Sequence, residues 1–326
     1  MPSTSNKKLL ILYVLEVLRE YSDEEHPLKQ DEIAQKIFSS HGMECERKAI
    51  AANIGYLEDY GLDIVHVKNK GVYLGSRALE PSEITFLVDA IFSNRTIDGK
   101  YSQQLAEKLY NCLSLHKRKR YKYVYKTTEI AKSHNKEVFF NIDEIQSAID
   151  AHKKVEFHYH GYSIAKGETD IWRRVSPYFL FNSQGKYYLV CSIGPNYGLA
   201  NYKVERMTDV RLTDISADSI TAIKGCEKGL DIAKYVNENI YAFTGNSVTA
   251  TLQLFDDGAY NAVIEWFGEN VRTYINDGKT YAEVRVNELA LIYWALQYGH
   301  GVEVLAPQST RDKIKSAVFK LAEKYK

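Results

Sequence analysis

IWRRVSPYFL, residues 171–180, leads through the Gly185-Lys186 step into YYLVC, residues 187–191, and YKVERM follows at 202–207. Short apolar or alternating runs separated by turn residues predict β-strands. The segment 155–159, VEFHY, alternates in the same way just before them. Several short strands close together predict a small β-structure in the middle of the chain.

These residues resemble a WYL domain. In that family, a β-segment ending near a proline is followed by a Gly-led Trp-Tyr-Leu strand and then by a strand with a basic-x-x-Arg pattern. Here Tyr187 replaces the tryptophan, Tyr188 and Leu189 keep their places, and Lys203 and Arg206 match the later pattern. The resemblance implies a small, Sm-like ligand-sensing β-barrel, usually joined to a DNA-binding module.

Composition sets limits on the whole chain. Its 326 residues suit two or three domains. Lys plus Arg equals Asp plus Glu at 42 each, so nucleic acid can be attracted only by local basic patches. The apolar run at 9–15 is far shorter than the roughly 20 residues that cross a bilayer, and no cleavage pattern follows it. We therefore expect a cytoplasmic protein without membrane contact.

The sequence offers no motif for catalysis or for a cofactor. The four cysteines are widely separated, which argues against a zinc cluster or a disulfide framework. No Walker glycine loop, G-x-S-x-G elbow or H-E-x-x-H helix occurs. His158 and His160 lie on one face of a predicted strand but lack the further donors that a metal needs. We expect no enzymatic activity, no metal and no cofactor.

The first 80 residues predict a DNA-binding module. Apolar residues at helical spacing predict three helices, at 7–21, 28–40 and 46–59. Alternation on either side of Asn69-Lys70-Gly71 then predicts a β-hairpin over 62–75. This order resembles the winged helix-turn-helix found ahead of WYL domains, although Ala49 and Ala52 depart from the residues common there. The alternative is a helical oligomerisation domain.

In a helix-turn-helix, early residues of the second helix of the motif read base edges in the major groove, and a wing can hold the adjacent backbone. The helix at 46–59 takes the first role and the hairpin takes the second. We therefore expect double-stranded DNA to be contacted by Arg47, Lys48, Asn53, Lys68, Lys70 and Tyr73.

A helical connector with a basic linker is expected at 81–135. Helices are predicted at 84–93, begun by Pro81, and at 101–115. Residues 116–126 then carry six basic residues and no acid. Such a run is either a solvated helix end or linker, or a segment whose tyrosines and cations lie along a phosphate backbone.

The predicted barrel, at 136–225, carries cations beside aromatic rings. Guanidinium groups match phosphate, and aromatic faces stack on bases, so this combination suits a nucleotide or a short single-stranded nucleic acid. In a regular strand Lys203 and Arg206 would face opposite ways, so a twist or bulge would be needed to bring them together. The alternatives are that the tyrosines are core residues and that Arg206 pairs with Glu205 or Asp209. The candidate ligand contacts are Tyr159, Trp172, Arg173, Arg174, Tyr187, Tyr188, Lys203 and Arg206.

Residues 226–326 predict a linking helix and then the order βαββαβα, with Asn276-Asp277-Gly278 as the turn between the middle strands. That order suits a ferredoxin-like extension. The predicted elements are the strands 248–254, 271–275, 280–286 and 302–305 and the helices 258–267, 288–298 and 308–325.

Together these parts predict an α+β multidomain protein. The function expected is that of a ligand-responsive, DNA-binding transcriptional regulator, with repression preferred to activation. As a homodimer it would hold two recognition helices roughly 34 Å apart, or a multiple of that distance. The alternative is an accessory protein of a defence system that binds RNA or single-stranded DNA.

Overall fold

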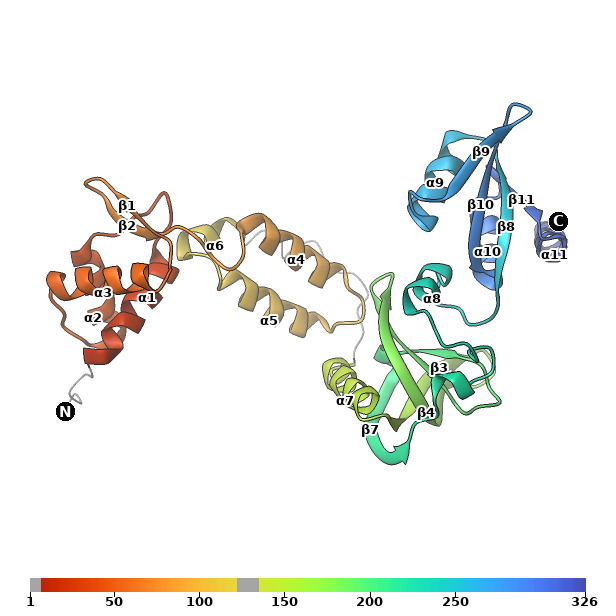
Figure 1. Cartoon of the computed structure of the whole chain (residues 1–326), viewed down its shortest axis with the longest axis horizontal. Coiled ribbons are helices and arrows are strands. Elements are labelled where there is room, and N and C mark those ends of the chain that lie inside the picture. The colour runs from red at the N-terminus through yellow and green to blue at the C-terminus, as the bar shows by residue number, and fades with distance from the viewer. Residues whose placement is uncertain (1–6, 122–134) are drawn as a thin grey trace. The chain divides into compact units, whose positions relative to one another are not determined.

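The computed structural model describes residues 7–121 and 135–326 and divides into two compact units, Met1–His134 and Asn135–Lys326. Both units contain helices and sheets, so the chain is an α+β multidomain protein (Figure 1). No described helix combines the length and the apolar character that a bilayer crossing requires.

The first unit begins with a small three-helix core. Its inner residues recur at helical spacing, as Leu10, Val14 and Leu18 do in the first helix and Ile50 and Ile54 in the third, and all five are buried. The helices are α1 (Leu10–Tyr21), which follows a 3₁₀ turn (Lys7–Leu9), α2 (Gln30–His41) and α3 (Arg47–Asp59).

A two-stranded hairpin, β1 (Ile64–Val67) and β2 (Gly71–Leu74), follows α3. It is fixed to the segment before α2, because Leu28 and Val72 exchange both backbone hydrogen bonds, at 2.8 and 2.9 Å. Gly71 has φ +118°, and a Cβ added there would lie 2.1 Å from the Leu28 carbonyl oxygen. Only glycine fits this close crossing of two backbones.

The connector is a helical hairpin, α4 (Pro81–Ser93) and α5 (Gly99–Tyr110), followed by the short helix α6 (Leu115–Tyr121). Pro81 opens α4, and Asp98 caps α5 by accepting from the backbone amides of Lys100 and Tyr101. The beginning of the basic run is thus helical at 115–121, and its remainder, from residue 122, lies outside the described residues.

A buried polar joint ties α6 to the three-helix core. The Asp23 carboxylate is 3% exposed and accepts hydrogen bonds from the Ser114 hydroxyl and from the His26 backbone amide. The rings of His26 and His116 stack with centroids 3.7 Å apart. Arg77 donates to three backbone carbonyls that belong to the end of α1, to the residue after it and to the turn before α6. These contacts hold the start of α6 against the core.

The second unit begins with helix α7 (Val138–Asp150) and a five-stranded antiparallel sheet in the order β6-β5-β4-β3-β7. The two edge strands are consecutive in the chain, and only the 3₁₀ turn Val204–Arg206 separates them. Edges joined by three residues must lie close together, so the sheet curls around its core. The strands are β3 (Lys153–Ser163), β4 (Gly167–Ser183), β5 (Lys186–Ser192), β6 (Ala200–Lys203) and β7 (Met207–Ser216).

The core of this curled sheet is apolar and is closed by α7. Val155, Phe157, Val175 and Leu189 are all at most 1% exposed and pack with Ile145 of α7. A 3₁₀ turn (Ile220–Ala222) and helix α8 (Ile232–Glu238) lead on toward the last part of the unit.

The last part of the unit has its elements in the order expected from the sequence. Its four strands form an antiparallel sheet in the order β11-β8-β10-β9, so the first and third strands of this part lie at the centre. The fully buried Trp294 packs in its core. The elements are β8 (Ser247–Leu254), α9 (Asp257–Phe267), β9 (Arg272–Asn276), β10 (Lys279–Asn287), α10 (Glu288–Gln297), β11 (Val302–Ala306) and α11 (Gln308–Lys324).

Candidate functional site

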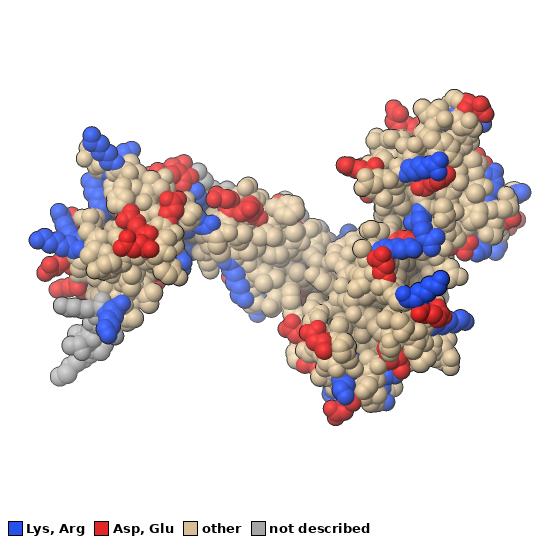
Figure 2. All heavy atoms as spheres, in the orientation of Figure 1, with Lys and Arg blue, Asp and Glu red and all other residues tan. Residues whose placement is uncertain are grey.

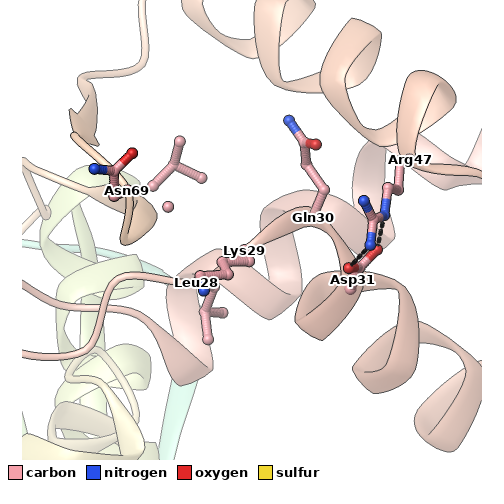
Figure 3. A pocket seen from close by; sticks show the side chains of 8 residues that line it. Leu28, Lys29, Gln30, Asp31, Arg47 and Asn69 are labelled. Carbon is pink, nitrogen blue, oxygen red and sulfur yellow. Dashed lines mark hydrogen bonds and ion pairs between the residues drawn. The ribbon is translucent and has the colours of Figure 1, made fainter.

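Two places in the chain bring together the side chains singled out by the sequence: the face of the first unit at the starts of α2 and α3, and the curled sheet of the second unit. On the first face, Arg47 is the first residue of α3 and Asp31 lies in the first turn of α2. The Arg47 Nε and Nη2 donate to the two carboxylate oxygens of Asp31, forming a two-point ion pair (Figure 3).

A hollow of about 300 Å³ lies beside this pair, between the start of α2, the start of α3 and the β1–β2 hairpin. Lys29 and Gln30, at the start of α2, and Asn69, at the tip of the hairpin, line it (Figure 3). The sequence reasoning missed Lys29. Its only signal was that it follows Pro27, just before the second predicted helix.

Three of the lysines on this face are exposed, Lys48 in α3 and Lys68 and Lys70 in the hairpin turn. Their side chains have no hydrogen-bonding or ionic partner among the described residues. Basic side chains project at the tip of this hairpin in Figure 2. Lysines of this kind are able to meet phosphate groups without giving up a contact within the protein.

The other two residues expected at DNA are less available. The Asn53 Nδ2 donates to the carbonyl oxygen of Ala49, one turn back in its own helix, at 2.7 Å. Its amide donor is therefore engaged and would have to leave Ala49 to pair with an adenine. Tyr73 is half-buried opposite Val65 in the hairpin.

On the curled sheet, the candidate ligand residues divide between the two faces of β3 and β4. Trp172 and Arg174 share the outward face, where the Arg174 guanidinium lies 4.9 Å from the Trp172 ring centre and 3.2 Å from a Glu156 carboxylate oxygen. Glu156 stands directly across the ladder from Arg174. This exposed arginine is thus held by an acid and an aromatic ring together.

Arg173 points the other way. Its Nε donates to the hydroxyl of Tyr202 at 3.1 Å, and the Tyr202 ring packs edge-on against Tyr159, with centroids 4.8 Å apart. Tyr202 was not among the residues singled out from the sequence. Its alternation with Lys203 along the strand was the available signal. Burial raises the pKa of the Tyr159 hydroxyl, so it stays protonated as a hydrogen-bonding group.

The 3₁₀ turn settles how Lys203 and Arg206 are arranged. Lys203 is the N-cap of the turn Val204–Arg206 and Arg206 is its last residue, so the two cations stand at the two ends of one turn instead of along a regular strand. Burial, together with the positive charges of Lys186 and Arg206, lowers the pKa of Lys203. Lys186 and Arg206 thus lie near Lys203, as does the acid Glu205, whose charge opposes the shift, and Lys186 was not predicted from the sequence.

Aromatic rings lie beside these cations, and a hydrogen bond from α7 holds the turn that carries them. The Arg206 guanidinium lies 5.9 Å from the Tyr162 ring centre. Arg206 forms no ion pair with Glu205 or Asp209 within residues 7–121 and 135–326: Glu205 Oε2 is buried without a partner, and Asp209 lies 3.6 Å from Arg211. The buried Asn141 of α7 donates to the Met207 carbonyl oxygen at 3.0 Å and so holds the exit of the turn.

The two tyrosines at 187 and 188 are mainly packing residues. Tyr188 is 8% exposed and stacks on Phe181, with ring centroids 5.4 Å apart. Tyr187 is partly buried against the core of the curled sheet. The Lys203 ammonium lies 6.0 Å from the Tyr188 ring centre, so the Tyr188 ring is next to this cation.

The histidines on β3 have separate partners. The His158 Nδ1 lies 3.0 Å from Asp170, and the His160 Nε2 lies 2.7 Å from the Thr208 hydroxyl. In the part of the chain that the structure describes, no three donors of the kinds that hold metal ions come together.

Comparison with known families matches two stretches of the second unit. Residues 141–212 match the WYL domain, and residues 246–322 match the WCX domain. The WYL match covers α7 and the curled sheet through most of β7, and the WCX match covers the four-stranded sheet and its helices.

Among curated proteins, the chain is 25% identical over 192 residues to the "Uncharacterized HTH-type transcriptional regulator YobV" of Bacillus subtilis (strain 168). That alignment spans 56% of this chain and 55% of the relative, so it covers about half of each.

Two solved structures are more distant. Proteasome accessory factor B/C (PafBC) of Arthrobacter aurescens is 18% identical, with a TM-score of 0.28 over 95% of this chain and 48% of that one. The structure titled "Crystal structure of a CRISPR Cas-related protein" is 15% identical, with a TM-score of 0.39 over 100% of this chain and 87% of that one. The second unit therefore contains a WYL domain followed by a WCX domain, and about half of the chain is similar to a protein named as an HTH-type transcriptional regulator.

Proposed function

We propose that this protein is a ligand-responsive repressor that binds double-stranded DNA through its first unit and senses an anionic effector through its WYL domain. Residues 1–80 form a winged helix-turn-helix, 81–135 a connector, 136–225 an Sm-like barrel and 226–326 a ferredoxin-like extension. Three helices followed by a clamped hairpin, a curled five-stranded sheet and a β11-β8-β10-β9 sheet support this division.

The observation that carries the DNA proposal is the face formed by the starts of α2 and α3 and the hairpin tip. It presents Lys48, Lys68 and Lys70 without partners among the described residues, beside a hollow lined by Lys29. A recognition helix in the major groove with a wing on the adjacent backbone needs cations at these positions. The chain as a whole has no net charge, so the arrangement of charges supports binding here.

The effector site is the cationic cluster of Lys186, Lys203 and Arg206, with Tyr159 and Tyr162 beside it. The lowered pKa of Lys203 arises from burial and from like charges, and an incoming phosphate would relieve that repulsion. Rings of tyrosine next to the cations would stack on a base. A nucleotide or a short single-stranded nucleic acid meets both requirements. Arg174 and Trp172 are left out of this site because Arg174 is already held by the Glu156 carboxylate and by the Trp172 ring.

The effector acts by shifting an equilibrium between two arrangements of a homodimer, which differ in the distance between their recognition helices. It can do so only if it binds the two arrangements unequally. The joint at Asp23 makes the start of α6 and the three-helix core one body, so movement of the connector carries α3 with it.

The experiment is a binding titration of the full chain with a duplex from its own promoter region, with the same sequence as a single strand, and with an unrelated duplex. We expect the promoter duplex to bind most tightly, and Lys48→Ala to weaken binding while Lys279→Ala, at the start of β10, does not. Preference for the single strand, unchanged by Lys48→Ala, would overturn the proposal and favour an accessory protein that binds single-stranded nucleic acid.

A further inference from the structure

The pair between Arg47 and Asp31 leaves one edge of the guanidinium unused. Arginine has five N–H donors, and Asp31 takes one from Nε and one from Nη2. The remaining three lie at the far end, on Nη1 and Nη2. That end has the two-donor geometry that matches the O6 and N7 acceptors of guanine.

The pair is too exposed to be a device for stability. Arg47 is 69% exposed and Asp31 is 45% exposed, and ion pairs in such surroundings contribute little to folding. Its effect is instead to fix the direction of a long side chain that would otherwise sample many rotamers. Preorganising a donor edge in this way lowers the entropy lost on binding.

Arg47 also differs from the lysines of the same face in that its charge is neutralised by a carboxylate. Lys48, Lys68 and Lys70 form no ion pair in the described part of the chain, as suits contacts to phosphate. Arg47 and Asp31 together carry no net charge, and a carboxylate next to a phosphate would be repelled. The pair is therefore poorly suited to a phosphate and well suited to a neutral base edge.

We propose that Asp31 is a positioning residue that directs Arg47 to a guanine in the major groove. This inference rests on the proposed function, and it assigns the face one base-specific contact made by a two-residue unit from two helices. Phosphate contacts on the same face belong to the lysines. Figure 3 shows the pair at the edge of the hollow, with the Arg47 side chain extending to the Asp31 carboxylate at α2.

The test uses the full chain and a duplex selected from a randomised library, in which each guanine is replaced in turn by 7-deazaguanine, which lacks N7. For the wild type we expect one guanine in each half-site whose replacement lowers affinity about tenfold. In the Asp31→Asn and Arg47→Ala variants, replacing that guanine by 7-deazaguanine should no longer change the affinity. Arg47→Lys keeps the charge but lacks the two-donor edge, so it should not restore discrimination.

Salt dependence supplies the second readout, one that a merely structural role would not move. Asp31→Asn releases Arg47 toward phosphate, so the slope of log affinity against log salt should steepen by about 0.9 per protomer. Glu46→Gln is the matched control, because it removes one acid beside Arg47 on the exposed N-cap of α3, and Glu46 makes no side-chain cap bond. It should leave both the guanine discrimination and the slope unchanged.

Retention of guanine discrimination in Asp31→Asn would overturn the inference. So would an Arg47→Ala variant that keeps the discrimination while its salt slope falls by about 0.9. In both cases the protein still binds duplex DNA, and the proposed function stands. Failure of the wild type to select any duplex from the library would instead refute the proposed function.

Discussion

The hairpin turn offers the cleanest perturbation of DNA binding, because Lys68 and Lys70 can both be changed to Ala without loss of a side-chain hydrogen bond or ion pair among the described residues. Both side chains are exposed, and the turn is held by Asn69 and Gly71, which have positive φ, and by the strand register. We therefore expect the double variant to fold as the wild type does and to differ only in its electrostatic attraction to DNA.

The size of the effect follows from counterion release. Each phosphate contact contributes about 0.9 to the slope of log affinity against log salt. Two lost contacts should lower the magnitude of the slope by about 1.8 per protomer, or about 3.6 for a dimer. At about 0.1 M salt, each contact contributes roughly eightfold relative to 1 M, so the double variant should bind about 60-fold more weakly per protomer.

Fluorescence anisotropy with a labelled duplex, between roughly 50 and 200 mM salt, measures both quantities. Lys279→Ala is the control, since Lys279 is also an exposed lysine, next to a hairpin turn of the second unit. A double variant with an unchanged slope would show that the hairpin does not lie on the DNA backbone. A slope lowered equally by Lys279→Ala would show that binding is spread over the whole surface.

Four further results are expected. Asp23→Ala should destabilise the first unit by about 2–4 kcal/mol in denaturant unfolding, because it leaves buried donors unpaired, and an unchanged midpoint would contradict the joint. Burial acts to raise the pKa of Asp23, but hydrogen bonds from a serine, a histidine and backbone outweigh burial and lower the pKa. The contribution of ionised Asp23 to the free energy of unfolding should therefore be full above about pH 4 and fade as the pH falls through the lowered pKa. Asp23→Asn should make the free energy of unfolding less dependent on pH in this range. Gly71→Ala should lower the unfolding midpoint strongly, since its Cβ would meet a backbone oxygen 2.1 Å away, and a normal midpoint would mean the hairpin is not clamped. Lys203→Ala with Arg206→Ala should abolish binding of a short labelled oligonucleotide to the WYL domain while Arg174→Ala retains it, and the opposite ranking would move the site to the other face.

Element order was predictable wherever apolar periodicity was strong. The βαββαβα order of the C-terminal part emerged because Val248, Leu252 and Leu254 on its first strand and Val284 and Val286 on its third point to one core. The basic run at 116–126 has no such periodicity. Its first part is helical in contact with the core, with Lys117 on Glu24 and Ser114 on Asp23, and contacts between distant residues cannot be read from local pattern.

The sequence predicted which residue types lie at the candidate sites, but less well how those residues are arranged in space. Lys203 and Arg206 were singled out, but the 3₁₀ turn between them depends on the closure of the sheet edges and on a buried Asn141, neither of which has a local signal. The partners of Arg47 and Asn53 were also hidden. One is an acid sixteen positions away, and the other is the residue's own helix.

We propose above all that duplex DNA lies on the face made by the starts of α2 and α3 and the hairpin tip. Lysine acylation followed by mass spectrometry, with and without a selected duplex, tests it most directly. The account predicts protection of Lys29, Lys48, Lys68 and Lys70, while Lys315 and Lys320 of α11 react as before. Protection of the α11 lysines, with Lys29, Lys48, Lys68 and Lys70 left fully reactive, would contradict binding of duplex DNA at the starts of α2 and α3 and the hairpin tip.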